Sequence, residues 1–311
     1  MTARAWYDDL PLRGPFLERE PMGRHCSWRA GGVAERYFEP ADVEDLAIFL
    51  AHAPADEPIT WLGLGSNVLV RDGGLPGTVI ATARAFDRLE RIGECEIEAG
   101  AGVPCAKVAK AAAKVALHGG EFLAGIPGSL GGALAMNAGA FGGETWRLVR
   151  EVETLDRAGR RRRRAASDYR IGYRSVSAPS GGEWFIGARL RFEAGTDDAA
   201  QERIRTLLAR RAATQPLGLP SCGSVFRNPP GDFAGRLIEA AGMKGVRCGG
   251  CVVSEKHANF IVNDANGTAS DIETLIARIK AAVLAQSGVG LDTEVRILGC
   301  PVPGASPEAR P

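Results

Sequence analysis

One glycine-rich stretch constrains the chain most: residues 125–143, which read GIPGSLGGALAMNAGAFGG. Glycine lets main-chain N–H groups approach a ligand closely, although each glycine costs roughly 0.5–1 kcal/mol within a regular element. So many glycines in one place predict a binding surface. The stretch lacks the GK[ST] ending of a nucleoside triphosphate loop, so we expect it to cradle the phosphate of a bound cofactor and not to support phosphoryl transfer. Tight turns in a glycine-rich fold are the structural alternative.

Composition narrows the class of protein. A chain of 311 residues is long enough for two or three domains. Its 38 Lys and Arg residues balance 37 Asp and Glu residues, which gives no global argument for nucleic acid or a membrane surface. Seven irregularly spaced cysteines fit a reducing compartment. Residues 1–20 lack the apolar core of a signal peptide and no run of 18 apolar residues occurs, so we expect a cytoplasmic protein.

A second glycine turn, Gly63-Leu-Gly-Ser-Asn67, lies between two apolar segments that we expect to be strands. A turn whose successive N–H groups point inward makes an anion-binding nest. We expect the chain to break at residues 215–220. Upstream of this break, strands are expected ending near residue 38 and at 59–62, 68–70, 78–80, 95–99, 149–156 and 184–192. The expected helices are one capped by Asp42, one from Pro104 to Gly119 or Gly120, and one at 197–211.

The last third predicts a small α+β unit. We expect a strand at 223–226, a helix at 232–241, a strand at 258–262, a helix with a capping box formed by Ser270 and Glu273, and a strand at 293–298. Cys248 and Cys251 have CxxC spacing, but a second pair is lacking and the glycines between them indicate a turn, so no metal site is expected. Five arginines at 160–164 follow Ala158-Gly159 and predict a solvated hairpin turn, with nucleic-acid binding as the alternative.

Three short segments carry polar residues that composition does not require. They read SCGSVFRNP at 221–229, YRIGYRS at 169–175 and TEVRIL at 293–298. Each has a structural alternative: a strand-edge serine, a surface arginine and an exposed cross-strand pair. No GxSxG elbow and no HExxH pattern occurs, so the common hydrolase and zinc-protease chemistries are excluded.

Several long motifs occur in the order found in one enzyme family. They are the GGxA strand, LGxGSN, GIPGSLGGALAMNAGA, the YR pair, SCGSVFRNP, PPGxFAGxLIE, KHANFIVN and TEVRILG, spread over residues 27–299. On these motifs the chain resembles the UDP-N-acetylenolpyruvoylglucosamine reductases, in the shorter of the two forms of that family. These are flavoenzymes that complete the muramic acid unit of bacterial peptidoglycan.

The resemblance implies an α+β protein. It would have a two-subdomain FAD-binding region of the PCMH/vanillyl-alcohol oxidase type followed by a C-terminal α+β substrate-binding domain. On this reading residues 1–20 are an N-terminal arm, 21–85 and 86–213 are the two FAD-binding subdomains, 214–300 is the substrate-binding domain, and 301–311 is a disordered tail. The break at Gln215 agrees with the last domain boundary.

Site residues are carried over motif by motif. The catalytic set corresponds to Ser224 as the acid, with Arg174 and Glu294 as charged helpers, and substrate binding to Tyr173, Arg227, Asn228 and Gln215. The FAD-binding positions are Gly63, Gly65, Ser66, Asn67, Gly125, Ile126, Pro127, Gly128, Ser129, Gly131, Gly132, Asn137, Ala138 and Gly139.

The chemistry of such an enzyme explains these residue types. Hydride can add to the terminal carbon of an enolpyruvyl double bond only if the charge that accumulates toward the carboxylate is stabilised, which suits Arg174. A positioned hydroxyl such as that of Ser224 can protonate the other carbon, and Glu294 would hold the substrate or intermediate. The resemblance implies non-covalent FAD, NADPH as co-substrate and ping-pong kinetics, because the flavin serves two substrates in turn.

The expected partners are UDP-N-acetylglucosamine enolpyruvate and NADPH, on a monomer that binds neither nucleic acid nor membrane. Two alternatives stay open from sequence. One is a FAD-dependent oxidase of the same superfamily acting on an alcohol or sugar, against which stand the Ser, Arg and Glu set and the lack of a histidine motif for a covalent flavin link. The other is a non-catalytic nucleotide-sugar or RNA-binding protein that uses the arginine run and the glycine turns.

Overall fold

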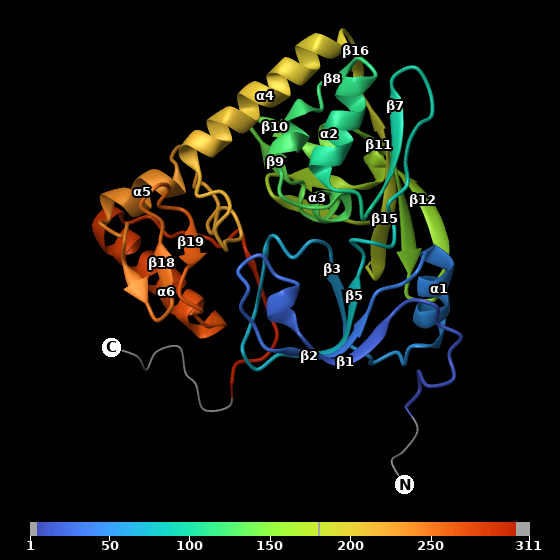
Figure 1. Cartoon of the computed structure of the whole chain (residues 1–311), viewed down its shortest axis with the longest axis horizontal. Coiled ribbons are helices and arrows are strands. Elements are labelled where there is room, and N and C mark those ends of the chain that lie inside the picture. Colours follow the sequence, from blue (N-terminus) through green and yellow to red (C-terminus); the bar gives the residue numbers. More distant parts are fainter. Residues whose placement is uncertain (1–4, 180, 303–311) are drawn as a thin grey trace. The chain divides into compact units, whose positions relative to one another are not determined.

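The computed structural model describes residues 5–179 and 181–302 (Figure 1). The chain divides into two compact units, each assembled from separate stretches of sequence. Unit 1 is built from Met1–Leu17, Tyr37–Leu64 and Thr78–Arg210, and unit 2 from Glu18–Arg36, Gly65–Gly77 and Arg211–Pro311. A single cut in the sequence therefore cannot separate the two units.

A four-stranded sheet with the order β1-β2-β5-β3 begins the fold. Its strands are β1 Phe16–Pro21, β2 Val33–Phe38, β5 Leu75–Ala81 and β3 Ile59–Leu62. Helix α1 (Val43–His52) follows β2, and the Asp42 carboxylate caps it by accepting from the amide of Asp45. The apolar face of α1 belongs to a buried cluster with Phe38 and Ile80. Burial of this face against aromatic and aliphatic side chains stabilises the helix.

A five-stranded sheet with the order β12-β11-β15-β7-β6 lies in unit 1, and all its neighbouring strands are antiparallel. Its strands are β12 Arg161–Ala165, β11 Val149–Asp156, β15 Glu183–Arg191, β7 Glu96–Gly100 and β6 Leu89–Arg91. Helices α2 (Cys105–Lys114) and α3 (Leu130–Met136) lie beside it in Figure 1, and α3 contacts β7 and β15. Their apolar residues share one buried cluster with the sheet, which fixes the position of the glycine-rich stretch.

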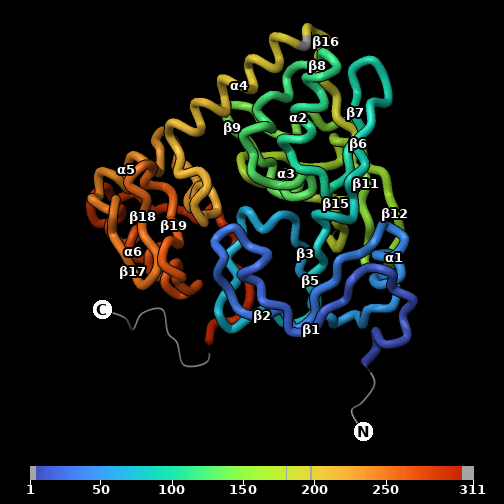
Figure 2. Tube along the Cα trace, viewed as in Figure 1, coloured from blue at the N-terminus to red at the C-terminus, as the bar shows by residue number. Residues whose placement is uncertain are grey.

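Unit 2 has its own core. Strands β17 (Arg247–Cys248), β18 (Cys251–Val253) and β19 (Ile261–Asn263) form an antiparallel sheet. Helices α5 (Ala234–Ala240) and α6 (Ala269–Ser287) contact each other, and α6 contacts β17 and β18 (Figure 2). Strand β4 (Val68–Val70) pairs in parallel with β20 (Arg296–Leu298). The core includes Trp28, whose indole N–H donates to the Ile261 carbonyl oxygen at 2.7 Å, so the N-terminal part of the unit is tied to β19.

Short elements and one long helix complete the chain. The short strands are β8 Leu117–His118, β9 Gly139–Ala140, β10 Gly143–Glu144, β13 Arg170–Gly172, β14 Ser175–Ser177 and β16 Glu193–Ala194. The 3-10 turns are η1 Met22–Arg24, η2 Glu121–Gly125, η3 Thr145–Arg147 and η4 Ala166–Asp168. Helix α4 runs over Asp197–Thr214.

Most expected elements are confirmed, and three are wrong in detail. The helix after Pro104 ends at Lys114, because the backbone turns at Ala116 (φ +58°) into β8. Residues 223–226 form only an isolated bridge between Phe226 and Thr293. The capping box of α6 consists of Thr268 and Asp271, three residues apart, and not of Ser270 and Glu273. Glu273 is instead engaged by the Arg71 guanidinium at 3.0 Å.

The expected domain boundaries differ to varying degrees from the bounds of the two compact units. The boundary between residues 213 and 214 lies close to the observed division between Arg210 and Arg211. The proposed arm at 1–20 includes most of β1, and the range 21–85 contributes to both compact units. Residues 303–311 of the proposed tail lie outside the described residues. The functional division into two FAD-binding subdomains stays a prediction.

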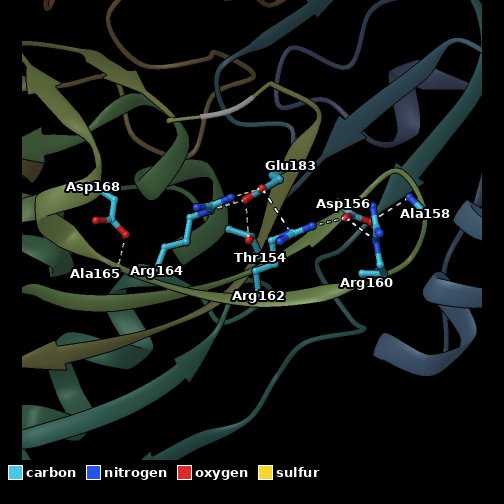
Figure 3. Close-up of polar contacts among 9 residues, drawn as sticks. All are labelled: Thr154, Asp156, Ala158, Arg160, Arg162, Arg164, Ala165, Asp168 and Glu183. Atoms are coloured by element: carbon cyan, nitrogen blue, oxygen red, sulfur yellow. Dashed lines mark hydrogen bonds and ion pairs between the residues drawn. The ribbon is translucent and has the colours of Figure 1, made fainter.

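The arginine run lies mainly in strand β12 and not in a hairpin turn, because Gly159 (φ +73°) makes the turn before the strand begins. Each arginine forms an ion pair within unit 1. The pairs are Arg160–Asp156, Arg161–Glu44, Arg162–Asp156, Arg163–Glu151 and Arg164–Glu183. Figure 3 shows how Glu183 also accepts from the Thr154 hydroxyl at 2.9 Å. The positive charge of the run is therefore balanced by neighbouring carboxylates of unit 1.

The Glu183→Gln substitution tests this network. The Glu183 side chain is only 5% exposed. Glutamine in its place carries no negative charge, so the ion pair with Arg164 would be lost. Hydrogen bonds to charged groups contribute about 1.5–3 kcal/mol, so we expect the free energy of unfolding, measured by urea titration, to fall by about that amount. The matched control is Glu202→Gln, which breaks an exposed pair with Arg205 on α4 and should cost less than about 0.5 kcal/mol. Equal losses in the two variants would contradict the network.

Candidate FAD and substrate site

The glycine-rich stretch contains one buried hydroxyl without a partner. Ser129 is 1% exposed, and no described residue hydrogen-bonds its Oγ. It precedes α3 as the N-cap residue but makes no side-chain capping bond. The hydroxyl faces Gly63, where an added Cβ would stand 2.5 Å from Oγ. The first residue of the second glycine turn therefore lies against the glycine-rich stretch, as a shared cofactor site requires.

Backbone bonds hold this part of the stretch in place. The amide of Cys105 donates to the Gly128 carbonyl, and the amides of Leu130 and Gly131 donate to the carbonyls of Val103 and Ala101. An added Cβ at Gly131 would stand 2.9 Å from the Ala101 side chain, so glycine is needed there for packing. The amides of Leu130 and Gly131 are thus used internally. Gly132 is exposed, and a Cβ added there would lie 3.8 Å from its nearest neighbour, Ser129 Oγ. A ligand can therefore approach the Gly132 backbone closely.

The downstream half of the stretch receives the side chain of Arg174. Its Nη2 donates to the Gly139 carbonyl at 2.9 Å, and its Nη1 to the Asn137 carbonyl at 3.4 Å. Arg174 occupies a left-handed conformation (φ +52°) in the turn between β13 and β14, and its guanidinium lies 5.2 Å from the centre of the Tyr173 ring. The structure therefore brings the YR pair to the glycine-rich stretch, although 35 residues separate Arg174 from Gly139.

The Asn137 side chain is hydrogen-bonded within unit 1. It is fully buried in a left-handed conformation (φ +47°), and its Nδ2 donates to Glu144 and to the Gly172 carbonyl. Its Oδ1 accepts from the amide of Trp146 at 3.2 Å. Both ends of this side chain are thus engaged inside the protein. Any contribution of Asn137 to a cofactor would come through its main chain.

The remaining cofactor positions in the glycine-rich stretch vary in exposure. Ile126 and Ala138 are each 8% exposed, Pro127 is exposed, and Gly128 is half-buried. An added Cβ at Gly125 would collide with the Phe141 ring. Packing therefore requires glycine at position 125.

The second half of the 63–67 turn belongs to unit 2. Gly65 is left-handed (φ +62°), and an added Cβ would collide with the His25 carbonyl oxygen. The amide of Ser27 donates to the Gly65 carbonyl at 3.0 Å. Asn67 Nδ2 donates to the Glu294 carbonyl at 3.2 Å, and Ser66 is half-buried. The turn is thus tied directly to the segment that carries the expected catalytic glutamate.

The structure brings Ser224 and Glu294 together within unit 2. The amide of Glu294 donates to the Val225 carbonyl at 2.8 Å, which sets the two residues on adjacent backbone segments. Gly223 supplies a left-handed turn (φ +69°) just before Ser224. Ser224 is half-buried, and among the described residues none hydrogen-bonds its hydroxyl. That hydroxyl is therefore available to a ligand.

The four expected substrate-binding residues differ in how far their side chains are already hydrogen-bonded within the protein. Arg227 has a buried Nε without a hydrogen-bond partner among the described residues, a donor that a ligand could satisfy. Asn228 accepts the amide of Ala234 at the start of α5 with its Oδ1. Gln215 accepts from Arg211 Nε at 2.9 Å at the end of α4, and Tyr173 is half-exposed. Arg227 is thus the best supported of the four.

Two residues near Ser224 were not expected from sequence to matter. Cys222 donates through Sγ to the carbonyls of Gly65 and Val68, and burial raises its pKa to about 12, so the thiol is not a nucleophile at neutral pH. Asn259 bonds the backbone on the C-terminal side of Ser224. The KHANF motif contains Asn259, but sequence alone does not show which backbone it contacts.

Features that would point to other chemistry are few. All seven cysteines are free. Within residues 5–179 and 181–302 no group of three or more His, Cys, Asp or Glu side chains could hold a metal ion. No helix in the described part of the chain combines the length and the apolar character needed to cross a membrane.

Known proteins share this arrangement. The profile described as "FAD binding domain" matches residues 34–164, and the profile "UDP-N-acetylenolpyruvoylglucosamine reductase, C-terminal domain" matches residues 215–298. The UDP-N-acetylenolpyruvoylglucosamine reductase of Methylococcus capsulatus is 57% identical over 289 residues, which cover 93% of this chain and 95% of that protein. This chain belongs to the UDP-N-acetylenolpyruvoylglucosamine reductase family.

Two further relatives agree. The reductase of Alkalilimnicola ehrlichii is 57% identical over 286 residues, covering 92% of this chain and 95% of that protein. The crystal structure of the reductase from Thermus caldophilus superposes with a TM-score of 0.79 at 30% identity, covering 93% of this chain and all of that one. The expected fold class, a FAD-binding region followed by a C-terminal α+β domain, is confirmed.

FAD fits the residues that are present. The buried Ser129 hydroxyl has no hydrogen-bond partner among the described residues, and it lies beside Gly63, which has no Cβ to block it. It can therefore donate a hydrogen bond to an oxygen of the cofactor. Assignment of the individual cofactor-binding residues stays a prediction.

The Ser129→Ala substitution tests this cradle. Its hydroxyl has no partner among the described residues, so its removal should leave the melting temperature of the FAD-free protein unchanged or slightly higher. Loss of a hydrogen bond to a charged oxygen of the cofactor should raise the Kd for FAD, measured by fluorescence titration, by about 10- to 100-fold. The control is Thr145→Val, which removes a bond to the Ala138 carbonyl and should destabilise the FAD-free protein. An unchanged Kd in Ser129→Ala would refute the assignment.

Proposed function

We propose that this FAD-dependent oxidoreductase reduces the enolpyruvyl group of UDP-N-acetylglucosamine enolpyruvate to UDP-N-acetylmuramate, a step in peptidoglycan precursor synthesis, with NADPH as the electron donor. Relatives named for this reduction are 57% identical to the chain over more than nine-tenths of its length. The observation in the structure that carries the proposal is the Ser224 hydroxyl, which has no partner among the described residues and is held beside Glu294.

The reaction needs a hydride at one alkene carbon and a proton at the other. Bound FAD would supply the hydride-transfer chemistry that links oxidation of NADPH to reduction of the terminal carbon of the enolpyruvyl group. Ser224 Oγ holds the proton for the carbon that bears the ether oxygen, and solvent then restores the proton on Oγ. A general acid of this kind contributes about 10²- to 10⁴-fold to the rate. Its hydroxyl is suited to that task because no hydrogen bond from residues 5–179 or 181–302 competes for it.

Charged groups of the chain stabilise the intermediate in this proposal. Arg174 supplies a fixed positive charge for the carboxylate of the substrate, and its bonds to the carbonyls of Asn137 and Gly139 hold the guanidinium in one orientation. Preorganised groups of this kind contribute about 2.7–4 kcal/mol to transition-state stabilisation. Glu294 orients the substrate by hydrogen bonding, and Arg227, Asn228, Tyr173 and Gln215 are proposed to bind the nucleotide sugar.

A cytoplasmic monomer that binds neither nucleic acid nor membrane stays part of the proposal. The arginines of β12 are paired with carboxylates, which leaves little free positive charge for RNA. A salt-dependent affinity for RNA would contradict this part alone and leave the proposed reaction standing.

The two half-reactions separate the role of Ser224 from a general loss of structure. In Ser224→Ala, flavin reduction by NADPH under anaerobic conditions should keep its rate, because the hydroxyl takes no part in that step. Reoxidation by the enolpyruvyl nucleotide should slow by about 10²- to 10⁴-fold. Stopped-flow absorbance of the flavin measures both rates. Equal slowing of both half-reactions would remove Ser224 as the acid, and reoxidation only by oxygen in the wild type would indicate an oxidase.

A further inference from the structure

The buried side-chain amide of Asn259 hydrogen-bonds the backbone of the segment that follows Ser224. Asn259 is 3% exposed. Its Oδ1 accepts from the amide of Phe226 at 2.9 Å, and its Nδ2 donates to the carbonyl of the same residue at 2.8 Å. The main-chain carbonyl of Asn259 also accepts from the amide of Val225 at 2.9 Å. Three bonds from one residue thus fix the three successive peptide units between Ser224 and Arg227, a segment that lies in no regular strand.

The opposite side of this segment is fixed by backbone alone. The amide of Glu294 donates to the Val225 carbonyl, and the amide of Arg227 donates to the Asp292 carbonyl at 2.9 Å. Phe226 is 1% exposed in the core of unit 2. The segment after Ser224 therefore lies between residues 292–294, which bond it through their backbone, and Asn259, which also bonds it through its side chain.

The loop that presents Asn259 is itself rigid. Ser254 Oγ accepts from the amides of Lys256 and His257, at 3.2 and 3.3 Å. The amide of Asn259 donates to His257 Nδ1 at 3.2 Å, and the amide of Ser254 donates to the Phe260 carbonyl. A loop closed by these bonds presents the Asn259 amide in one orientation before any ligand binds.

The structure assigns to Asn259 a positioning role in proton transfer, and this inference rests on the proposed role of Ser224 as the acid. Phe226 is two residues from Ser224, so loss of the Asn259 bonds frees the segment that aims the hydroxyl. A displacement of about 1 Å at a reacting group can cost about 10²-fold in rate. The primary amide supplies an acceptor for the N–H and a donor for the C=O of one residue, Phe226, a pairing that a hydrocarbon side chain of the same size cannot supply.

The Asn259→Ala variant is compared with a matched control, Asn263→Ala. Asn263 is 5% exposed, and its amide likewise bonds backbone groups, those of Trp28 and Gly267. Both variants should lose similar stability to urea and keep the rate of flavin reduction by NADPH. Reoxidation by the enolpyruvyl nucleotide should slow by about 10²-fold in Asn259→Ala and by less than about threefold in Asn263→Ala. Equal slowing in both would overturn the inference.

A double variant distinguishes this inference from the proposed function. If Asn259 acts through Ser224, then adding Asn259→Ala to Ser224→Ala should change the reoxidation rate by less than about threefold. A full effect of Asn259→Ala in the Ser224→Ala background would refute the positioning role alone. Unimpaired reoxidation in Ser224→Ala by itself would refute the proposed function, whatever Asn259 does.

Two readouts do not depend on the overall rate. Hydrogen exchange at the amides of Val225 and Phe226 should accelerate in Asn259→Ala and not in Asn263→Ala. In Asn259→Asp the carboxyl group can donate to the Phe226 carbonyl only when protonated, so its reoxidation rate relative to wild type should rise as the pH falls. Unchanged exchange at both amides, or a pH-independent ratio, would contradict the role.

Discussion

Irregular backbone that is buried must find partners for its N–H and C=O groups, and this constraint shapes the functional segments of the chain. Neither the glycine-rich stretch nor the segment after Ser224 lies within a long strand. Asn137 and Asn259 supply the missing partners, each with both ends of its amide engaged. Asn263 does the same for the loop that precedes α6. Three buried amides thus replace the ladders that regular sheets provide elsewhere.

The sequence predicted local structure well because local structure depends on neighbours. The cap at Asp42 and strand β11 follow from residues a few positions apart. The motifs also identified the family, since their order is preserved over most of the chain. The motifs pointed to Ser224 and Glu294 as partners. The hydrogen bond that joins their backbones, from Glu294 to Val225, connects residues 69 positions apart, and hydrophobic periodicity carries no information about such a contact.

The failures have the same physical origin. The arginine run was expected in a solvated turn because its partners, such as Glu183, lie 19 residues away and were not paired with it in the sequence. The capping box at α6 was misplaced by two residues, since Thr268 and Asp271 have the same spacing as Ser270 and Glu273. Long-range pairing and competition between equivalent local patterns are not visible in one sequence.

Strand β12 has a further consequence for the behaviour of the protein in solution. It is an outer strand of the five-stranded sheet, so one edge of its backbone is open to another strand. An open edge invites pairing between molecules, which leads to aggregation. Four of the five residues of β12 are arginines in ion pairs, and a second copy that approached this edge would have to strip water from these charged side chains. The same side chains that stabilise the sheet from within therefore help to keep concentrated protein from associating.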